Sequence, residues 1–389
     1  MQYTKDPKSG NELSILGYGC MRLPSDFAKA EKLLVEAVEA GVNYFDTAYI
    51  YGNNEVTVGS ILEKNGLREK IYLATKLPHQ KCKDYESIEK LFSEQLDRLK
   101  TTYIDYYLIH NIPDMAAWKR LCDFGIEKWI EEKKSSGQIK QIGFSFHGTQ
   151  KDFMELLDIY DWEFCLIQYN YMDENYQAGK AGLNKAYEKG MAVMIMEPLL
   201  GGKLATGLPT KAVQLFQKLD TNRSMASWAL RWLWTQPGVS VVLSGMNKPE
   251  QLEDNVKTAS IARDEMLSDI ESNVYTPVIE ALRESYKVPC TGCNYCMPCP
   301  VGVNIPGCFM AYNSSYVMGL VSGFTLYLTG TSAYRKESKA RASCCIKCGA
   351  CLDKCPQSIA IPDMLGAVAK KMEPLWVRAI LSIARLFMR

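Results

Sequence analysis

The feature that most constrains the fold of this chain is a regular alternation of short apolar runs with longer amphipathic stretches. Within the longer stretches, apolar residues recur at a spacing of about 3.6, the period of a helix, so the alternation predicts strands and helices in turn. Strands are predicted at residues 16–20, 42–45, 71–75, 104–109, 141–145, 164–168, 192–196 and 239–243. Helices are predicted at residues 30–40, 88–99, 150–159 and 222–235, followed by a last one at 271–286.

This alternation indicates a parallel sheet, because parallel neighbours need a crossover connection that is usually a helix. Eight such units in roughly 250 residues favour an α/β fold of the (β/α)8 TIM-barrel type. The alternative is an open doubly wound sheet, but no G-x-G-x-x-G sequence follows the first predicted strand. We therefore expect a TIM barrel.

The 14 cysteines are distributed unevenly, and ten of them lie between Cys290 and Cys355. The N-terminal segment lacks the apolar stretch of a secretory signal, so we expect a cytoplasmic protein whose thiols stay reduced. The clustered cysteines therefore predict metal binding. The alternation ends near residue 259, and Val288-Pro289 forms a natural boundary. Three parts are expected: a barrel at 1–283, a metal-binding domain at 284–365 and a basic amphipathic C-terminal helix at 366–389.

Two cysteine runs have the spacing of iron–sulfur ligands. Residues 290–300 read CTGCNYCMPCP and residues 345–356 read CIKCGACLDKCP. The second run matches the bacterial ferredoxin pattern C-x2-C-x2-C-x3-C-P, and the first is one residue short before its last cysteine. Paired cysteines also bind zinc, but zinc sites normally use two spaced pairs. The runs therefore predict two [4Fe–4S] clusters in a small ferredoxin-like domain.

The cluster ligands follow from the pattern, because in two-cluster ferredoxins the fourth cysteine of each run ligates the other cluster. One cluster is predicted to bind Cys290, Cys293, Cys296 and Cys355, and the other to bind Cys345, Cys348, Cys351 and Cys299. The shortened spacing of the first run leaves Cys308 as an alternative to Cys299. Cys344 adjoins a predicted ligand and is given no role.

Polar side chains follow the predicted strands at their carboxyl ends, where TIM barrels carry their catalytic groups. These residues are Asp46, Lys76, His110, Ser145, His147, Gln168 and Glu197, and Tyr51 lies in the loop after Asp46. Reduction of a carbonyl by hydride puts negative charge on its oxygen, so an acid must lie within hydrogen-bond reach. An ammonium group beside a tyrosine favours the phenolate and lowers the pKa of that tyrosine. The set is therefore suited to carbonyl reduction.

The segments DTAYIYG after the second predicted strand, ATK at the end of the third and LIH at the end of the fourth resemble the motifs of aldo-keto reductases. The resemblance covers residues 10–260 and implies a catalytic tetrad of Asp46, Tyr51, Lys76 and His110. It implies that Tyr51 donates the proton, Asp46 holds Lys76, and His110 orients the carbonyl oxygen. The whole chain resembles the aldo-keto reductases that carry a C-terminal 4Fe–4S domain.

The same resemblance implies a set of coenzyme contacts for NAD(P)H. Ser145 and Gln168 would bind the nicotinamide carboxamide, with His147 either a coenzyme contact or a structural residue. The other implied contacts are Met196, Gly245, Lys248, Gln251 and Asn255. Met196 stands where the family usually has an aromatic, and Gln251 where an arginine commonly grips the 2′-phosphate of NADP. The choice between NADPH, NADH and a flavin therefore stays open, since a guanidinium is the preferred phosphate clamp.

Charge and hydropathy suggest partners. The formal net charge of +1 gives no indication of nucleic-acid binding, but residues 284–365 carry seven basic and four acidic side chains. This basic region predicts an acidic ferredoxin or flavodoxin as partner. No apolar run is long enough to span a bilayer. The apolar and basic segment 374–389 is expected to dock on the barrel or on a second subunit of a homo-oligomer; the alternative is peripheral contact with a membrane surface.

Three functions are consistent with these features. The first is an oxidoreductase acting on a small carbonyl or alcohol at the tetrad, with the clusters linking it to an electron-transfer partner. The second is a reductase without NAD(P), in which the clusters feed a flavin or a redox-active substrate. The third is an electron-transfer protein with a non-catalytic barrel, and the intact tetrad argues against it.

Overall fold

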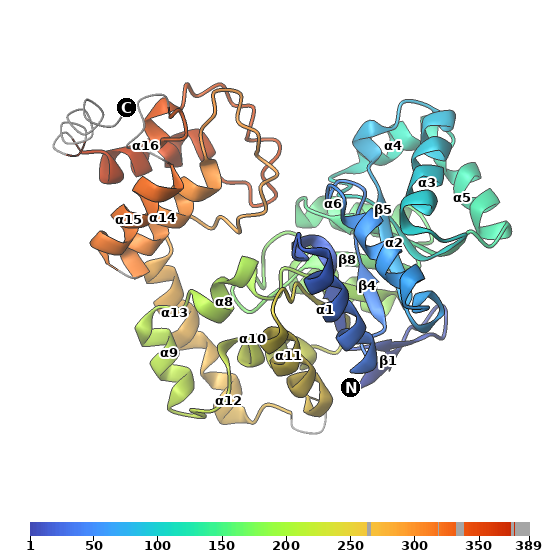
Figure 1. Ribbon diagram of the computed structural model, residues 1–389, viewed down its shortest axis with the longest axis horizontal. Helices are drawn as coiled ribbons and strands as arrows, with labels where there is room; N and C mark the ends of the chain where they lie inside the picture. The colour runs from blue at the N-terminus through green and yellow to red at the C-terminus, as the bar shows by residue number, and fades with distance from the viewer. Residues whose placement is uncertain (263–265, 318, 332–337, 375–376, 378–389) are drawn as a thin grey trace. The chain divides into compact units, whose positions relative to one another are not determined.

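Eight parallel strands close into a barrel with the neighbour order β10-β3-β4-β5-β6-β7-β8-β9, as expected from the sequence (Figure 1). The barrel strands are β3 (Leu16–Gly19), β4 (Tyr44–Asp46), β5 (Tyr72–Leu77), β6 (Ile104–Ile109), β7 (Ile139–Phe146), β8 (Phe164–Gln168), β9 (Ala192–Met196) and β10 (Val239–Ser244). This computed structural model describes residues 1–262, 266–317, 319–331, 338–374 and 377. The predicted TIM-barrel fold is confirmed.

Side chains fill the barrel interior, so it is a packed core. The inward-facing set includes Tyr44, Tyr106, Phe164, Met194 and Val241, all of which are buried. The strand register places residues at the carboxyl ends side by side, with Asp46 opposite Ala74 and Lys76 opposite Leu108. Closure of the barrel thereby brings polar residues that are distant in sequence to one end of the sheet.

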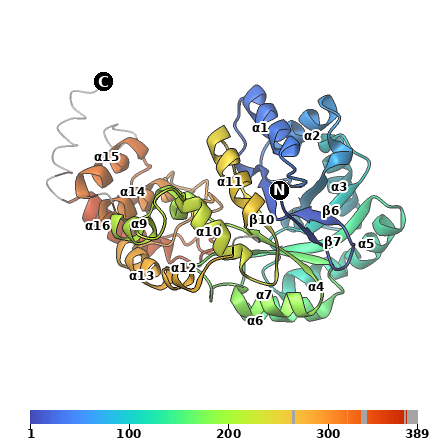
Figure 2. The ribbon, with the colours of Figure 1, turned by 90° about the horizontal axis from the view of Figure 1, so that it is seen from below.

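Helices surround the strands of the barrel (Figure 2). They are α1 (Phe27–Glu39), α2 (Asn54–Lys64), α3 (Tyr85–Leu99), α4 (Met115–Asp123), α5 (Ile126–Ser135), α6 (Gln150–Ile159), α7 (Gly179–Glu188), α10 (Met225–Trp234) and α11 (Pro249–Ile261). Local sequence sets their starts. The side chain of Asp84 accepts a hydrogen bond from the Ser87 amide, and the Ser87 hydroxyl oxygen accepts one from the Asp84 amide. These two hydrogen bonds fix the first turn of α3.

A short hairpin precedes the barrel and was not predicted. Its strands β1 (Tyr3–Lys5) and β2 (Glu12–Ser14) pair antiparallel, and each has three residues, too few to show a period-2 pattern. Leu13 is buried with the barrel-interior residues. Asp6 accepts a hydrogen bond of 2.7 Å from the hydroxyl of Tyr106, near the start of β6. The hairpin therefore covers the amino-terminal end of the barrel.

The chain divides into two compact units, and the division differs from a single boundary after residue 283. The first, here called the barrel unit, contains residues 1–199 and 226–272; the second, here called the cysteine unit, contains 200–225 and 273–389. Residues 200–225 follow β9, yet they pack with the cysteine unit. Within it, the Tyr286 hydroxyl donates to the Gly207 carbonyl at 2.6 Å, and the rings of Phe216 and Tyr275 lie 5.5 Å apart.

The cysteine unit is mainly helical. Its helices are α8 (Lys203–Thr206), α9 (Thr210–Gln217), α13 (Tyr275–Ser285), α14 (Ile305–Val317), α15 (Leu320–Gly330) and α16 (Ile361–Met372). Helix α12 (Asp269–Asn273) contains the boundary between the two units in the sequence. Because α12 ends at Asn273 and α13 begins at Tyr275, the single helix predicted at 271–286 is interrupted. Val303, Phe309, Leu365 and Val368 form part of a separate apolar core. Of the C-terminal helix predicted at 366–389, residues 366–372 belong to α16, and residues 375–376 and 378–389 lie outside the described residues. Among the described helices, none is long and apolar enough to cross a membrane.

Candidate active site and cysteine cavities

The four residues of the predicted tetrad lie at one end of the barrel. Asp46 is the last residue of β4, Lys76 lies near the end of β5, and His110 directly follows β6. Tyr51 lies in the turn between β4 and α2, where its amide donates to the Ala48 carbonyl. Each side chain thus comes from a different strand end or the loop beyond it, and the barrel brings all four together.

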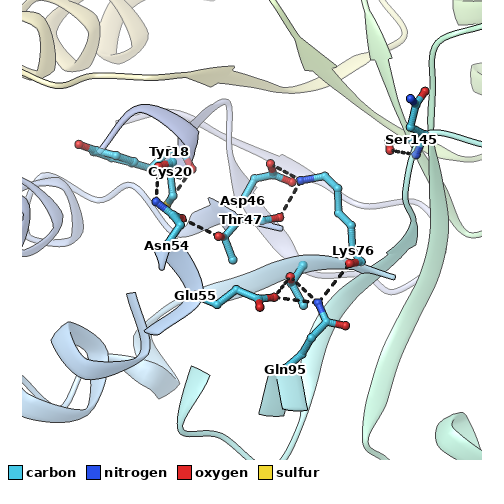
Figure 3. A network of polar contacts seen from close by, with 11 residues as sticks. Tyr18, Cys20, Asp46, Thr47, Asn54, Glu55, Lys76, Gln95 and Ser145 are labelled. Atoms are coloured by element: carbon cyan, nitrogen blue, oxygen red, sulfur yellow. Dashed lines mark hydrogen bonds and ion pairs between the residues drawn. The ribbon is translucent and has the colours of Figure 1, made fainter. Parts of the chain in front are cut away.

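A buried ion pair forms the centre of this group. Lys76 Nζ lies 2.6 Å from Asp46 Oδ1 and 2.7 Å from the carbonyl oxygen of Thr47. The two charged side chains are only 1% and 6% exposed. Burial raises the pKa of Asp46, and the neighbouring ammonium group of Lys76 opposes that rise. Figure 3 shows Asp46 and Thr47 both directed at Lys76, so the position of the ammonium group is well defined.

The two rings of the tetrad face this ion pair. Lys76 Nζ lies 5.3 Å from the centre of the Tyr51 ring, and the rings of Tyr51 and His110 meet edge to face at 6.0 Å. Burial and the nearby Lys76 charge hold the pKa of His110 well below its usual range, so the imidazole is neutral at physiological pH. Nδ1 of His110 has no hydrogen-bond partner among the described residues.

A second group of polar residues forms a hydrogen-bond network with the backbone of Lys76. The buried Glu55 carboxylate accepts hydrogen bonds from Thr75 at 2.6 Å and from Gln95 at 2.7 Å. Gln95 also donates to the Lys76 carbonyl oxygen at 3.1 Å (Figure 3). The Tyr107 hydroxyl donates to the Gln95 side-chain oxygen at 2.7 Å. This network fixes the backbone from which Lys76 extends. Sequence analysis missed it, because its members lie on helix and strand faces that only the fold brings together.

The predicted carboxamide contacts lie on neighbouring strands and take part in hydrogen bonds. Ser145 Oγ, near the end of β7, accepts from the Asn111 amide at 2.7 Å. Gln168, the last residue of β8, donates to Asp173 at 2.9 Å and accepts from Gln177 at 2.9 Å. His147 Nδ1 lies 3.0 Å from the Gln177 side-chain oxygen.

Gln177 therefore joins His147 to Gln168, an arrangement that the sequence analysis missed. Burial lowers the pKa of His147 to about 4, which keeps its ring neutral in this network. The run QYNYMDENYQ, residues 168–177, begins at the last residue of β8 and contains both Asp173 and Gln177; its many polar residues were the sequence signal for this network. Ser145, His147, Gln168, Asp173 and Gln177, here called the polar wall, lie beside the strands that carry the tetrad.

The other predicted coenzyme contacts lie on β9 and after β10. Met196 is half-buried at the end of β9, and Gly245 is exposed directly after β10. Lys248 precedes the first turn of α11, where the Gln251 side-chain oxygen accepts from the Asn247 amide at 2.9 Å. The buried Asn255 donates to Ser244 at 2.9 Å, which ties α11 to the end of β10. Gln251 thus stabilises the loop and supplies no positive charge.

Four cysteines predicted to bind one cluster surround a single cavity in the cysteine unit. Cys290, Cys293, Cys296 and Cys355 line it, together with Thr291 and apolar residues that include Ile305, Phe309 and Ile361. We call this space the first cysteine cavity. Burial, together with the smaller effect of the thiols of Cys290, Cys293 and Cys355, raises the pKa of Cys296 to about 12. Cysteines about 60 residues apart are thus neighbours.

The four cysteines predicted to bind the second cluster also lie close together. Burial raises the pKa of Cys351, and the thiols of Cys345, Cys348 and Cys299 act in the same direction at close range. Cys308, the alternative to Cys299, is fully buried in the apolar core and its thiol donates to the Ala340 carbonyl at 3.5 Å. Among the described residues, no three His, Cys, Asp or Glu side chains are close enough to hold a single metal ion. A [4Fe–4S] cluster holds its four sulfurs farther apart than a single ion does.

Comparison with known proteins identifies the family. The "Aldo/keto reductase family" model matches residues 15–272, and the "4Fe-4S dicluster domain" model matches residues 289–360. The first match covers more than half of the chain and coincides with the barrel. The chain belongs to the aldo/keto reductase family, and it is an oxidoreductase that carries a 4Fe–4S dicluster domain.

Similar proteins include the uncharacterized oxidoreductase YqkF of Bacillus subtilis, 28% identical over 319 residues, which cover 73% of this chain and 100% of the relative. A 6-dehydroglucose reductase of Novosphingobium aromaticivorans is 26% identical over 279 residues, covering 65% of this chain and 88% of the relative. Among solved structures, the holo form of aldo-keto reductase AKR11C1 from Bacillus halodurans has a TM-score of 0.61 and 27% identity, covering 72% and 96% of the two chains.

Proposed function

We propose that the barrel site reduces a small carbonyl compound, or oxidises the corresponding alcohol, with a nicotinamide coenzyme as the hydride carrier. The observation that carries this proposal is the buried pair of Lys76 and Asp46 at 2.6 Å, with the rings of Tyr51 and His110 facing it. A charge buried this deeply is costly unless it is paired, so its retention at a strand end favours a catalytic role.

The four side chains have complementary roles in this proposal. The Tyr51 hydroxyl donates a proton to the carbonyl oxygen as negative charge develops there. The Lys76 ammonium group stabilises the phenolate that remains, and Asp46 keeps this ammonium group charged and in place. His110 is neutral because its pKa is lowered, so it offers a hydrogen bond to the same oxygen without adding charge. A bound nicotinamide supplies the hydride.

The residues of the polar wall are suited to bind the carboxamide group of such a coenzyme. The Ser145 hydroxyl oxygen accepts from the Asn111 amide, so the hydroxyl hydrogen of Ser145 remains for donation to a ligand. Gln168 is held in one orientation by Asp173 and Gln177. A donor fixed in this way suits recognition of a planar carboxamide. A distantly related aldo-keto reductase from Klebsiella pneumoniae has been solved in complex with NADPH.

The cysteine unit is proposed to hold two [4Fe–4S] clusters with crossed ligation. Cys290, Cys293, Cys296 and Cys355 would bind the first, and Cys345, Cys348, Cys351 and Cys299 the second. The first cysteine cavity fits a cluster because thiols from both runs line it within an apolar surround. Bound clusters would exchange single electrons with an acidic ferredoxin or flavodoxin. Anaerobically purified protein should contain about eight irons per chain by this pattern.

The test of the barrel chemistry is Tyr51→Phe, which removes only the proton-donating hydroxyl. Loss of a general acid should lower carbonyl reduction by roughly 10²–10⁴-fold, measured by coenzyme oxidation with a panel of small aldehydes and ketones. Tyr49→Phe is the matched control, because Tyr49 belongs to the same motif but its hydroxyl donates to Glu94 at 2.8 Å. Equal turnover in Tyr51→Phe and the unaltered protein would contradict the proposal, whereas iron content should be the same in all three.

A second candidate is a reductase whose clusters feed a flavin or a redox-active substrate without NAD(P). A hydride carries two electrons and each cluster exchanges one, so conversion between them usually needs a flavin. Gln251 favours this candidate, since its side chain is used within the loop and gives no charge to a 2′-phosphate. Titration of the anaerobic protein with NADH, NADPH, FMN and FAD separates the two, because tight binding of a flavin alone would favour the second.

A further inference from the structure

One buried hydroxyl in the first cysteine cavity has no role in the proposed functions. Thr291 lies between Cys290 and Cys293, and only 5% of its surface is exposed. Thr291 lines the cavity with the four cysteines. Its Oγ1 atom is buried and has no hydrogen-bond partner among the described residues. Buried polar atoms nearly always have a partner, because an unsatisfied donor is costly, so this hydroxyl points to a group that the cavity receives.

We propose that the Thr291 hydroxyl donates a hydrogen bond to a sulfur of the first [4Fe–4S] cluster or of its cysteine ligands, and that Gly201 positions Thr291 for this contact. The inference rests on the proposed ligation of that cluster by Cys290, Cys293, Cys296 and Cys355. A hydroxyl has one donor hydrogen, and thiolate and sulfide sulfurs carry the negative charge that accepts it. Apolar neighbours such as Ile305 and Phe309 have no acceptor. Asn294 and Gln357 also line the cavity, but neither makes a hydrogen bond with Thr291 Oγ1.

The backbone of Thr291 is held by an unusually close approach of residues 200–202. A Cβ atom added at Gly201 would lie 2.1 Å from the Thr291 carbonyl oxygen, far closer than such atoms ever come. Gly201 also has a φ of +68°, which other residues rarely adopt. Only glycine therefore fits here. The contact lies within the cysteine unit and fixes the peptide that joins Thr291 to Gly292, next to two predicted ligands.

The second cysteine run has a different residue at the corresponding position. Ile346 follows Cys345 as Thr291 follows Cys290, and it is 66% exposed. Its side chain has no donor. The proposed hydrogen bond is therefore specific to the first cluster, and it favours the reduced, more negative state of that cluster. We expect the first cluster to have the higher reduction potential for this reason.

The experiment is Thr291→Val, which keeps the shape of the side chain and removes the hydroxyl. Loss of one hydrogen bond should shift the reduction equilibrium of the first cluster about tenfold towards the oxidised form, ~59 mV for one electron. The readout is an EPR-monitored redox titration, with the first cluster identified by its loss in Cys290→Ala. The second cluster should keep its midpoint potential. Thr291→Ser retains a hydroxyl and should restore the first midpoint potential, and Ile346→Val should change neither.

Gly201→Ala tests the positioning. Alanine at this site must displace Thr291, so the EPR signal of the first cluster should broaden or be lost while that of the second stays. Gly202→Ala is the matched control, because Gly202 has a φ of +96° but no atom within 4 Å of an added Cβ. Both variants strain the backbone, and only the first disturbs Thr291. Equal spectra for the two variants would overturn the role of Gly201.

The outcomes separate this inference from the ligand assignment on which it rests. If the unaltered protein lacks the first cluster, as shown by about four irons per chain and an EPR spectrum that Cys290→Ala leaves unchanged, the ligation and the hydrogen bond both fail. If both clusters are present and Thr291→Val leaves the first midpoint potential unchanged, only the hydrogen bond fails.

Discussion

The barrel site and the first cysteine cavity are both buried, but they balance their polar groups in different ways. In the barrel, the Asp46 carboxylate is paired with Lys76, and Glu55 accepts hydrogen bonds from Thr75 and Gln95. In the cavity, the four thiols lie among apolar side chains and the uncharged polar residues Thr291, Asn294 and Gln357, with no charged side chain among the described residues of the lining. The fold itself therefore stabilises the barrel site, whereas the cysteine unit is expected to depend on its metal for stability.

Removal of iron should give the largest difference in stability between the barrel unit and the cysteine unit. Because metal binding contributes directly to folding, the cysteine unit should lose cooperative unfolding when a chelator and an oxidant strip its clusters. The barrel unit should keep its unfolding temperature. Hydrogen exchange measured by mass spectrometry resolves the two, and protection should fall in residues 273–331 and 338–374.

The insertion after β9 makes this prediction sharper. Helix α9 lies between two barrel strands in sequence but packs with α13, as the contact of Phe216 with Tyr275 shows. It should therefore lose protection with the cysteine unit, while α10, which follows eight residues later, should keep it. If α9 stays protected in iron-free protein, the insertion belongs energetically to the barrel, and the comparison of the two units fails.

The same contrast explains what the sequence could predict. Strands β6, β8 and β9 have the predicted bounds, because continuous apolar runs are a direct consequence of burial in a barrel. The tetrad residues also gather as expected, since they occupy equivalent strand ends. Their catalytic roles stay predictions.

The features that were missed depend on contacts between distant segments. Nothing local in residues 200–225 indicates that they pack with residues 273–286, and Gly201 is noticeable only because Thr291 lies against it. Gln177 likewise connects His147 to Gln168 only once the loops are folded. Helices α14 and α15 were not predicted, and α16 was predicted only from residue 366 on, because the cysteine pattern dominated the interpretation of that region. Local periodicity reports burial, and it carries little information on tertiary pairing.

Acid should destabilise the barrel unit and spare the cysteine unit, because all three histidines of the chain lie in the barrel unit. Burial lowers the pKa of His79 and of His147 to about 4, and burial lowers that of His110 as well. The unfolded chain therefore binds more protons below about pH 6.5. Stability present above that pH is lost as the pH falls towards 4, by up to ~1.4 kcal/mol per pH unit for each histidine.

Urea unfolding of the barrel unit between pH 7 and pH 5 measures this slope. The raised pKa values of the buried Asp46 and Glu55 act in the opposite sense and reduce it. His79→Asn isolates one contribution, because an asparagine oxygen can replace Nδ1 as the acceptor for Arg120 at 3.1 Å. This variant should have a slope lower by ~1.4 kcal/mol per pH unit. An unchanged slope would mean that folding does not lower the pKa of His79.

The smallest effect concerns the surface of the cysteine unit and its proposed acidic partner. Steering between opposite charges speeds association and weakens as the screening length shortens with salt. Reduction of the clusters by an acidic ferredoxin should therefore slow by about tenfold between low and physiological ionic strength, the low end of such effects. Stopped-flow reduction by a small neutral dye should barely respond to salt. The contrast between the two reductants is the measurement.

Charge reversal locates this surface, and the structure decides which residues to change. Arg335 and Lys336 of the basic region lie outside the described residues, and Arg341 lies 3.7 Å from the buried Glu373, so its reversal would also disturb packing. Lys339 and Lys354 are exposed, and their change to glutamate should reproduce the effect of salt. Lys90→Glu on helix α3 makes the same charge change in the barrel unit and should leave the rate unaltered. Reduction rates that are independent of both salt and these charge reversals would contradict the prediction. The basic residues would then only solvate the surface, and the partner would be recognised elsewhere or would not be acidic.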